Sequence, residues 1–318
     1  MNQLNSLKQF SKIVVDSGDI SNIEQYQPDD VTTNPSLILQ LCKTNICHDI
    51  LDEAIIYAKQ KGGDYDYKIS NAINKIAVQI GIQIIRRIPG YISTEVHAKY
   101  SFNMDECIIQ AKKIIQMYEE EGVDRARVLI KLAATWESIQ AAKELIKCNI
   151  KCNLTLLFSW AQAVACAEAK VFLISPFVGR VYDWYALHYP VNKYDVNSDH
   201  GVLSVKKIFN YYKRYGYKTI IMGASFRNIE QILALSGCDR LTISPVLLEQ
   251  LKQNSGVVVR QLHLPMHIEN ISQSILSESE FRWKHNTDQM AVEQLSSGIR
   301  KFELDYQVLA KLVNQYLL

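Results

Sequence analysis

Short β-rich runs alternate with longer segments of helical periodicity along this chain, starting after the first 11 residues. The eight β-rich runs lie at residues 13–16, 31–33, 93–98, 128–133, 153–158, 171–177, 219–224 and 241–244. Most of the intervening segments are long enough for a crossover helix, which favours parallel strand pairing. Several runs are apolar on both faces, as strands are when helices cover one side and a barrel core fills the other. Eight such units predict a closed α/β barrel, the (β/α)₈ or TIM-barrel architecture, with an open doubly wound sheet as the alternative.

Local helix signals agree with this alternation. Asn34 is followed by a proline, which suits a first helical position, and Thr135 is a suitable cap for the helix after the fourth run. Gly237 would end a helix over residues 226–236. Beyond the eighth run the alternation stops. The last part of the chain, especially residues 290–318, is therefore predicted to form additional C-terminal helix that covers the barrel or joins subunits.

The length of 318 residues suits one barrel domain spanning residues 1–318, because α/β barrels commonly reach this size around a single core. The 35 basic and 33 acidic residues give a net charge of +2, so the chain has no broad field that would attract nucleic acid or an anionic membrane. The basic and aromatic run at 206–218 has apolar residues at helical spacing, which favours a solvated helix face over an RNA-binding surface. Any anion site is expected to be local.

Nothing in the sequence predicts export, a membrane span or a metal site. The longest nearly apolar run, residues 154–167, is interrupted by polar residues and falls short of the roughly 20 residues that a membrane-spanning helix needs. The polar start lacks the apolar segment of a secretion signal. Seven thinly spread cysteines suit reduced thiols in the cytoplasm. Cys148 and Cys152 are spaced like zinc ligands but lack a second pair or a nearby histidine.

A lysine in the middle of the fourth run points to chemistry. Lys131 sits within the apolar sequence VLIKLAA, and a buried ammonium is costly unless it is paired or gives up its proton. A neutral lysine amine attacks carbonyl carbons, and apolar neighbours favour the neutral form. The alternatives are a lysine paired with Glu95 or Asp16 inside the barrel, or a misread strand that leaves the amine exposed.

Polar residues gather at the ends of the predicted strands, where reactive groups collect in a barrel. They are Asp16, Thr33, Asn34, Glu95, Lys131, Asn153, Thr155, Ser175, Ser225 and Arg227, with Arg180 just beyond its strand. Asp16 and Glu95 are candidate proton acceptors or donors beside the lysine. Asp16 could instead begin a turn, and Glu95 could be a structural counter-ion.

A phosphate site is predicted after two consecutive strands. Arg180 and Arg227 would bring two guanidinium groups to the start of a helix that follows Ser225, and free backbone N–H groups there also favour an anion. The alternative is that Ser225 only caps the helix and that both arginines are solvated.

The ordered motifs of the chain resemble those of the transaldolase family. The matching segments are VVDSGD, TTNPSLIL, STEV, LIKLA with TW, CNLTLLFS with AQA, ISPFVGR with DWY, IMGASFRN, CDRLTISP and the C-terminal pattern that ends in GIRKF. The resemblance covers roughly residues 5–318. Ala134 and Trp160 depart from the family pattern, and neither occupies a position with a named catalytic role.

The resemblance implies a cytoplasmic, cofactor-free, homodimeric enzyme of carbohydrate metabolism, in the pentose phosphate pathway. It would transfer a dihydroxyacetone unit from sedoheptulose 7-phosphate to glyceraldehyde 3-phosphate, giving erythrose 4-phosphate and fructose 6-phosphate. Its partners would be these sugar phosphates, with no nucleic acid, membrane or metal. A lyase-type aldolase and a catalytically silent sugar-phosphate-binding protein are the alternatives.

The resemblance also implies roles for individual residues. Lys131 would form the Schiff base, Asp16 would take the proton of the C4 hydroxyl, and Glu95 would act through a water held by Thr155. Asn34, Asn153 and Ser175 would hold the dihydroxyacetone hydroxyls, and Arg180, Ser225 and Arg227 would bind phosphate. Thr33 and Phe177 are expected to contribute to substrate binding.

Phe177 bears on the choice between transfer and release. Related aldolases that release free dihydroxyacetone tend to carry tyrosine and glutamine at the positions of Phe177 and Glu95. A tyrosine hydroxyl could position a water for hydrolysis of the imine, and phenylalanine could not. The sequence therefore predicts a transferase.

Overall fold

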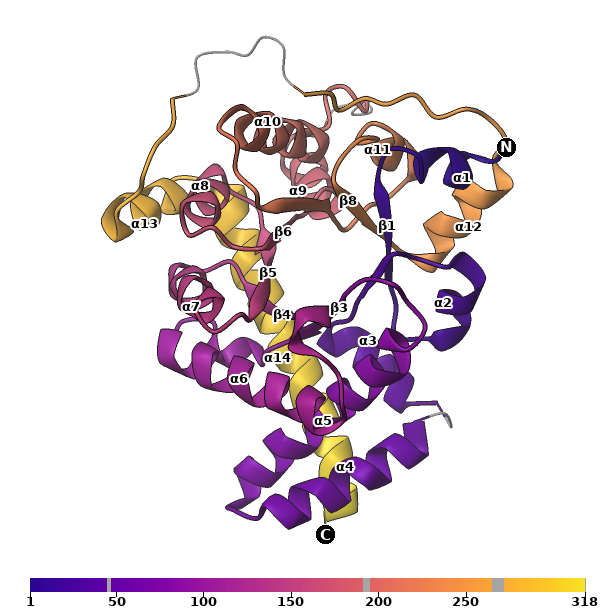
Figure 1. Cartoon of the computed structure of the whole chain (residues 1–318). Helices are drawn as coiled ribbons and strands as arrows, with labels where there is room; N and C mark the ends of the chain where they lie inside the picture. The colour runs from indigo at the N-terminus through magenta and orange to yellow at the C-terminus, as the bar shows by residue number, and fades with distance from the viewer. Residues whose placement is uncertain (45–46, 191–194, 265–271, 318) are drawn as a thin grey trace.

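The strands of the computed structural model close into one parallel barrel in the order of the sequence (Figure 1). The structure describes residues 1–44, 47–190, 195–264 and 272–317. The strands are β1 Lys12–Asp16, β2 Asp30–Thr32, β3 Ile92–Glu95, β4 Val128–Ala133, β5 Lys151–Leu157, β6 Leu173–Pro176, β7 Ile220–Gly223 and β8 Arg240–Ile243. Parallel pairing of β1 with β8 completes the ring. The predicted (β/α)₈ barrel is thus confirmed, and the open sheet is excluded.

Helices surround the barrel on its outer side (Figure 1). They are α1 Gln3–Leu7, α2 Ile20–Tyr26, α3 Pro35–Cys42, α4 His48–Lys61, α5 Tyr65–Ile85, α6 Met104–Glu120, α7 Trp136–Ile146, α8 Trp160–Glu168, α9 Gly179–His188, α10 His200–Arg214, α11 Ile229–Leu233, α12 Pro245–Gln253, α13 Glu278–Asn286 and α14 Gln289–Leu317, with short 3₁₀ helices η2 Ala98–Tyr100 and η3 Arg125–Arg127. None of the described helices is long and apolar enough to cross a membrane.

Each predicted run overlaps one strand, and the differences lie at the ends. The fourth run matches β4 residue for residue, whereas β3 ends at Glu95 and not at residue 98. The chain turns there into η2, which begins at Ala98. The turn matters for function, because it leaves Glu95 at the carboxyl end of its strand.

The predicted helix start after Asn34 and the predicted cap Thr135 are confirmed, and one helix start is wrong. The side chain of Asn34 accepts a hydrogen bond from the N–H of Leu37 and caps α3, and Thr135 caps α7 in the same way. The helix predicted over residues 226–236 is shorter, because Asn228 caps α11 and the helix ends before Ala234. Gly237 lies beyond that end with φ of +97°, a left-handed conformation that suits glycine.

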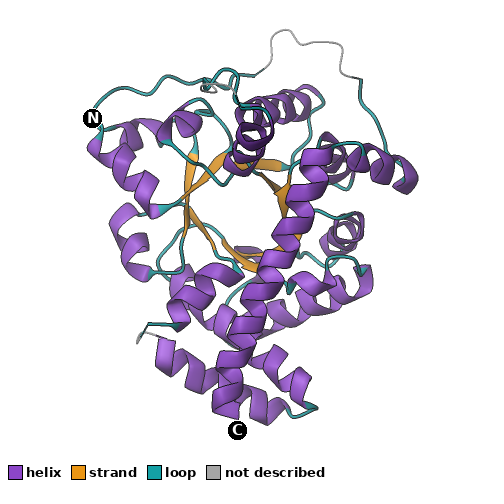
Figure 2. Ribbon diagram, turned by 180° about the vertical axis from the view of Figure 1, so that it is seen from behind, coloured by secondary structure: helices purple, strands orange, loops and turns teal. Residues whose placement is uncertain are grey.

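Helix α14 runs across one end of the barrel, as predicted for a covering helix (Figure 2). It contacts α3, α5, α9, η2 and β5. Gly298 allows this close packing, because a Cβ atom there would lie 2.7 Å from the side chain of Leu156 and 3.1 Å from a guanidinium nitrogen of Arg180. The helix therefore lies against the end of the barrel where the strands finish.

Candidate active site

Strand alternation explains why an apolar run holds a lysine. Leu129 of β4 points into the barrel, where it packs in a layer with Val14, Leu173 and Met222. Side chains two residues apart on a strand share a face, so Lys131 also points inward, one layer nearer the carboxyl end. The intervening residues of β4 join the core between strands and helices.

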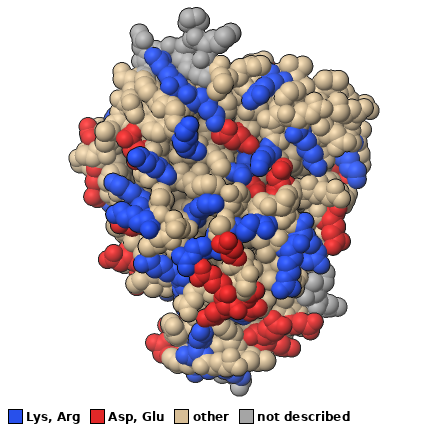
Figure 3. Space-filling model, viewed as in Figure 1, with Lys and Arg blue, Asp and Glu red and all other residues tan. Residues whose placement is uncertain are grey.

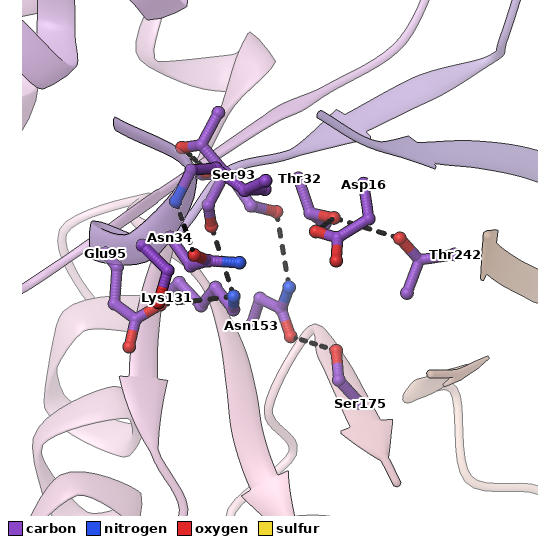
Figure 4. Close-up of polar contacts among 12 residues, drawn as sticks. Asp16, Thr32, Asn34, Ser93, Glu95, Lys131, Asn153, Ser175 and Thr242 are labelled. Atoms are coloured by element: carbon purple, nitrogen blue, oxygen red, sulfur yellow. Dashed lines mark hydrogen bonds and ion pairs between the residues drawn. The ribbon is translucent and has the colours of Figure 1, made fainter. Parts of the chain in front are cut away.

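The amine of Lys131 is buried and has two polar contacts (Figure 4). Lys131 is 6% exposed. Its Nζ lies 3.1 Å from Oε2 of Glu95 and donates a hydrogen bond of 3.1 Å to the carbonyl oxygen of Thr33. The exposed lysine that was one alternative is excluded, and the amine is paired with Glu95 instead of standing alone among apolar groups.

Glu95 is a buried carboxyl with perturbed acidity. Burial raises its pKa above the ordinary value, and the nearby charge of Asp16 acts in the same direction. The positive charges of Lys131 and Arg180 oppose this increase without cancelling it. A buried carboxyl whose pKa is raised holds a proton more readily, which suits a group that exchanges protons with a neighbour.

Asp16 lies at the carboxyl end of β1 and accepts a hydrogen bond of 2.9 Å from the hydroxyl of Thr32. The Thr32 hydroxyl also lies 2.9 Å from that of Thr242 on β8. The turn after β1 is held by other side chains, because the N–H of Asp19 donates to the Ser17 hydroxyl and Asp19 caps α2. The side chain of Asp16 is thus directed toward the barrel mouth, where it lines the pocket.

A second polar group spans β3, β5 and β6. The side-chain carbonyl of Asn153 accepts a hydrogen bond of 2.6 Å from Ser175, and its NH₂ donates one of 3.2 Å to Ser93 (Figure 4). The sequence analysis had not identified Ser93, which only the pairing of separate strands brings to this point. Thr155 on β5 is also buried, and its hydroxyl has no hydrogen-bond partner among the residues that the structure describes.

The loop after β2 contributes two of the predicted residues in different ways. The side chain of Thr33 donates to the carbonyl of Ser93 at 3.1 Å, so Thr33 faces Lys131 through its backbone oxygen. Asn34 caps α3 and also lines the pocket.

The predicted phosphate residues gather at one side of the barrel mouth. Arg227 forms an ion pair with Asp183, at 2.9 and 2.7 Å, and one of its nitrogens lies 3.4 Å from the Ser225 hydroxyl. The Arg180 guanidinium lies 5.1 Å from the ring centroid of Phe177. Burial lowers the pKa of Arg180, and the neighbouring charge of Arg227 adds to that effect. Two cations so placed favour an anion between them.

The position of Ser225 is set by its backbone conformation and contacts, and not by a role as a helix cap. The predicted helix start at this residue is wrong, since α11 begins at Ile229. Ser225 has φ of +61°, and its carbonyl accepts a hydrogen bond of 2.6 Å from the N–H of Gly179. A Cβ atom at Gly179 would lie 2.2 Å from that carbonyl, so glycine is required for the two loops to approach.

Most of these groups line one pocket of about 270 Å³, but Thr33, Glu95 and Asn153 are not among its lining residues. Its lining residues are Asp16, Thr32, Asn34, Ser36, Leu37, Lys131, Thr155, Ser175, Phe177, Arg180, Met222, Ala224, Ser225, Phe226, Arg227, Thr242, Ser244, Lys301 and Phe302. Lys131 and Asp16 thus share a pocket with the two arginines. Lys301 and Phe302, which come from α14, were not identified from the sequence.

Three contacts hold α14 over the pocket. Nε2 of His97 lies 2.6 Å from a carboxylate oxygen of Glu303, and the ring of Tyr306 stacks on His97. Farther along the helix, Asp305 accepts a hydrogen bond from Ser36 in the first turn of α3. Glu303, Asp305 and Tyr306 lie within five residues of Lys301, so these contacts fix the part of α14 that lines the pocket.

The outer surface carries mixed charge. Figure 3 shows lysine and arginine side chains interspersed with aspartate and glutamate on the face in view. Among the residues described, no three or more His, Cys, Asp or Glu side chains are grouped so that they could hold a metal ion. Cys148 is exposed and Cys152 is buried, so this pair does not form a shared surface site.

Comparison with known proteins places this geometry in a family. The family described as Transaldolase/Fructose-6-phosphate aldolase matches residues 13–313. A protein named Transaldolase from Buchnera aphidicola subsp. Acyrthosiphon pisum (strain Tuc7) is 59% identical over 315 residues, covering 99% of each chain. Transaldolase 1 of Pectobacterium atrosepticum is 56% identical over 313 residues, covering 98% of this chain and 99% of that one. The chain therefore belongs to the transaldolase/fructose-6-phosphate aldolase family.

Proposed function

We propose that this chain is a transaldolase, a transferase that moves a dihydroxyacetone unit between sugar phosphates. The donor is sedoheptulose 7-phosphate, the acceptor is glyceraldehyde 3-phosphate, and the products are erythrose 4-phosphate and fructose 6-phosphate. One observation carries the proposal: the buried amine of Lys131, 3.1 Å from Glu95, lines the same pocket as Asp16 and the arginine pair.

The first step is attack of the Lys131 amine on the C2 carbonyl of the donor. The carbinolamine loses water and leaves a protonated imine, a cation that accepts electrons from the adjacent C3–C4 bond. Glu95 lies 3.1 Å from the amine and has a raised pKa, which suits a group that exchanges the protons of this step. The Thr155 hydroxyl, buried without a partner among the described residues, suits a water that carries protons between Glu95 and the intermediate.

The second step breaks the C3–C4 bond. Asp16 removes the proton of the C4 hydroxyl, the C4–O unit becomes the aldehyde of the departing aldose phosphate, and the bonding electrons form an enamine on the three-carbon fragment. The acceptor aldehyde then binds, and the same steps run in reverse to form a new carbon–carbon bond. Asn34, Asn153 and Ser175 are assigned to the hydroxyls of the three-carbon unit.

Phosphate recognition is assigned to Arg180, Ser225 and Arg227. The Arg227–Asp183 ion pair keeps one guanidinium in place, and Arg180 is the more buried of the two cations. A phosphate between them gains charge-assisted hydrogen bonds in a partly dehydrated site. Binding the phosphate at the arginines while C2 lies at the Lys131 amine would fix the direction in which the sugar chain lies.

Borohydride trapping tests nucleophile and substrate class together. Reduction in the presence of fructose 6-phosphate should attach a three- or six-carbon unit to Lys131, which peptide mass mapping would locate. Lys131→Met should lose the adduct, whereas Lys151→Met, on the neighbouring strand, should keep it. Wild type without an adduct on Lys131 would contradict the proposal and favour a silent sugar-phosphate-binding protein.

Acceptor dependence separates the transferase from a lyase-type aldolase. The transferase should form erythrose 4-phosphate in quantity only when an acceptor aldehyde is present. Release of free dihydroxyacetone at the same rate without acceptor would instead identify a lyase.

The setting of the enzyme is part of the proposal. We assign it to the pentose phosphate pathway in the cytoplasm, as one barrel domain spanning residues 1–318 that pairs into a homodimer. The names of the relatives and their similarity along nearly the whole chain support the pathway. Sedimentation velocity of the purified protein at micromolar concentration should give the mass of a dimer, and a monomer across that range would contradict the assembly.

A further inference from the structure

Two thiols outside the pocket face each other between α3 and α4. Cys42 is the last residue of α3, and Cys47 immediately precedes α4. Their sulfur atoms lie 3.1 Å apart, and both cysteines are free. A disulfide bond needs about 2.05 Å between the sulfurs, so a movement of about 1 Å would join them.

The surroundings of the two thiols make them chemically unequal. Cys47 is the N-cap residue of the 14-residue helix α4, where the helix dipole favours a thiolate. The hydrogen bond with Cys42 lowers the pKa of Cys47, although burial opposes this effect, and the same contact raises the pKa of Cys42. Cys47 is therefore the better nucleophile, and Cys42 is the thiol in position to react with it afterwards.

A small oxidant has a place to meet Cys47. Cys47 is only 3% exposed, but it lines a cavity of about 50 Å³ together with Gly18, Leu41 and Ile80 among others. That volume exceeds the roughly 30 Å³ share of one water molecule, so a molecule the size of hydrogen peroxide fits. Cys42 is only half-buried.

The remaining cysteines provide an internal comparison. Cys152, Cys166 and Cys238 are buried, and burial raises the pKa of each thiol. Cys148 is exposed. Exposure without a neighbouring thiol leaves Cys148 as the natural control for unselective oxidation.

We propose that Cys42 and Cys47 form a reversible thiol–disulfide site that reacts with small peroxides, separate from the sugar-phosphate chemistry. The Cys47 thiolate attacks one oxygen of hydrogen peroxide, the O–O bond breaks, and Cys47 becomes a sulfenic acid as hydroxide leaves. The Cys42 sulfur then attacks the Cys47 sulfur, the S–O bond breaks, and hydroxide leaves as water after protonation. In total, two thiols and one peroxide give one disulfide and two waters.

The position of Lys43 allows a direct test on the full-length protein. Trypsin cleaves after Lys43, so Cys42 falls in peptide 13–43 and Cys47 in peptide 44–59. After brief exposure of wild type to equimolar peroxide, we expect these two peptides to appear as one linked species that separates on reduction. Titration should show the loss of two of the seven free thiols.

Variants distinguish the role of Cys47, which attacks the peroxide, from that of Cys42, which then forms the disulfide. Cys42→Ser should stop the reaction at the sulfenic acid of Cys47, which a dimedone-type probe would label, and Cys148→Ser should leave the linked peptides unchanged. The proposal is overturned if peroxide leaves Cys42 and Cys47 as thiols while Cys148 reacts. It is equally overturned if the dimedone label in Cys42→Ser falls on cysteines other than Cys47.

Discussion

At the scale of single residues, we expect the placement of Asp16 to make bond cleavage separable from imine formation. Asp16 lines the pocket but is not among the polar contacts of the Lys131 amine. Asp16→Asn keeps the shape of the side chain and the contact with Thr32, but an amide does not accept the C4 hydroxyl proton. We expect kcat to fall by roughly 10²–10⁴, the contribution typical of general acid–base catalysis.

The same variant should still form the Schiff base. Borohydride reduction of Asp16→Asn with fructose 6-phosphate is expected to label Lys131 as in wild type, because Lys131 and Glu95 are unchanged. Asp19→Asn is the matched control, since Asp19 caps α2 outside the pocket and asparagine also caps well. A variant that loses both turnover and the covalent adduct would show that Asp16 acts earlier than proposed.

Phe177 is the residue at which we expect transfer to compete with hydrolysis. Its ring lies 5.3 Å from that of Phe158 and lines the pocket, so this wall repels water from the intermediate. Phe177→Tyr adds a hydroxyl that could position a water against the imine. We expect free dihydroxyacetone from fructose 6-phosphate, without acceptor, to rise by roughly tenfold, about 1.4 kcal/mol of barrier. Phe102→Tyr, at an exposed ring, should change nothing, and an equal rise in both variants would refute the explanation.

Residue types at strand ends were predictable because chain direction and barrel geometry bring them together. Asp16 and Glu95 follow directly from where their strands finish, and Lys131 follows from its place within the apolar run of β4. The pairing of Lys131 with Glu95 was left open, since side-chain direction at the end of β3 depends on the turn into η2. Roles for Asn153 and Ser175 came only from the family resemblance.

At the scale of elements, α14 supplies a cation to the pocket from the far end of the sequence. Lys301 lines the pocket with Arg180 and Arg227. Lys301→Met should raise KM for a phosphorylated acceptor by roughly fivefold, about 1 kcal/mol, the size of a contact between partly exposed charges. Unphosphorylated glyceraldehyde should be unaffected, because it offers no anion to the amine.

Lys311→Met is the control for that measurement, as it removes the same charge from the same helix outside the pocket. A rise in KM that is equal for both acceptors would show that Lys301 shapes the helix and does not contact phosphate.

The contact between η2 and α14 should make stability depend on pH. Burial lowers the pKa of His97 to about 4, and Nδ1 is buried without a partner among the described residues. Between the ordinary pKa of about 6.5 and that value, the unfolded chain binds a proton that the folded chain does not. The free energy of unfolding should therefore fall as the pH drops from 6.5 to 4, by about 1–3 kcal/mol.

Urea unfolding at several pH values isolates this effect. His97→Asn still donates to Glu303 but does not titrate, so the difference between wild type and variant should shrink on acidification. His48→Asn changes an exposed histidine and should follow wild type. If the free energies of unfolding of His97→Asn and wild type change with pH in parallel, His97 is not the cause of the pH dependence.

The positions of the helices were less predictable from the sequence than those of the strands. The apolar run of β4 predicted the bounds of the strand because both of its faces are buried. In contrast, α11 is short and starts where the Asn228 side chain meets a backbone N–H, not where apolar spacing begins. The position of α14 depends on contacts of Glu303 with His97 and of Asp305 with Ser36, which join residues more than 200 positions apart. Local patterns do not encode such contacts.

At the scale of the whole molecule, the pocket and a buried ion pair lie at opposite ends of the barrel. The pocket lies at the carboxyl ends of the strands, while a buried ion pair joins Arg240 and Asp30, the first residues of β8 and β2, at 2.5 Å. These strands flank β1 on either side, so the pair spans the point where the first and last strands close the ring. The sequence pattern predicts eight strands, but not which charges meet at this closure.

Breaking this ion pair should weaken the fold and spare the chemistry. Arg240→Met leaves the Asp30 carboxylate buried, its pKa already raised by burial, and should lower the free energy of unfolding by about 3–5 kcal/mol. Adding Asp30→Asn removes the unpaired charge and should recover part of that loss. Well below the melting temperature both variants should keep kcat/KM near wild type, because the pair lies at the opposite end of the barrel from Lys131. Urea unfolding and steady-state kinetics on the same samples test both halves, and a folded Arg240→Met protein with a large loss of kcat/KM would show that the two ends are coupled.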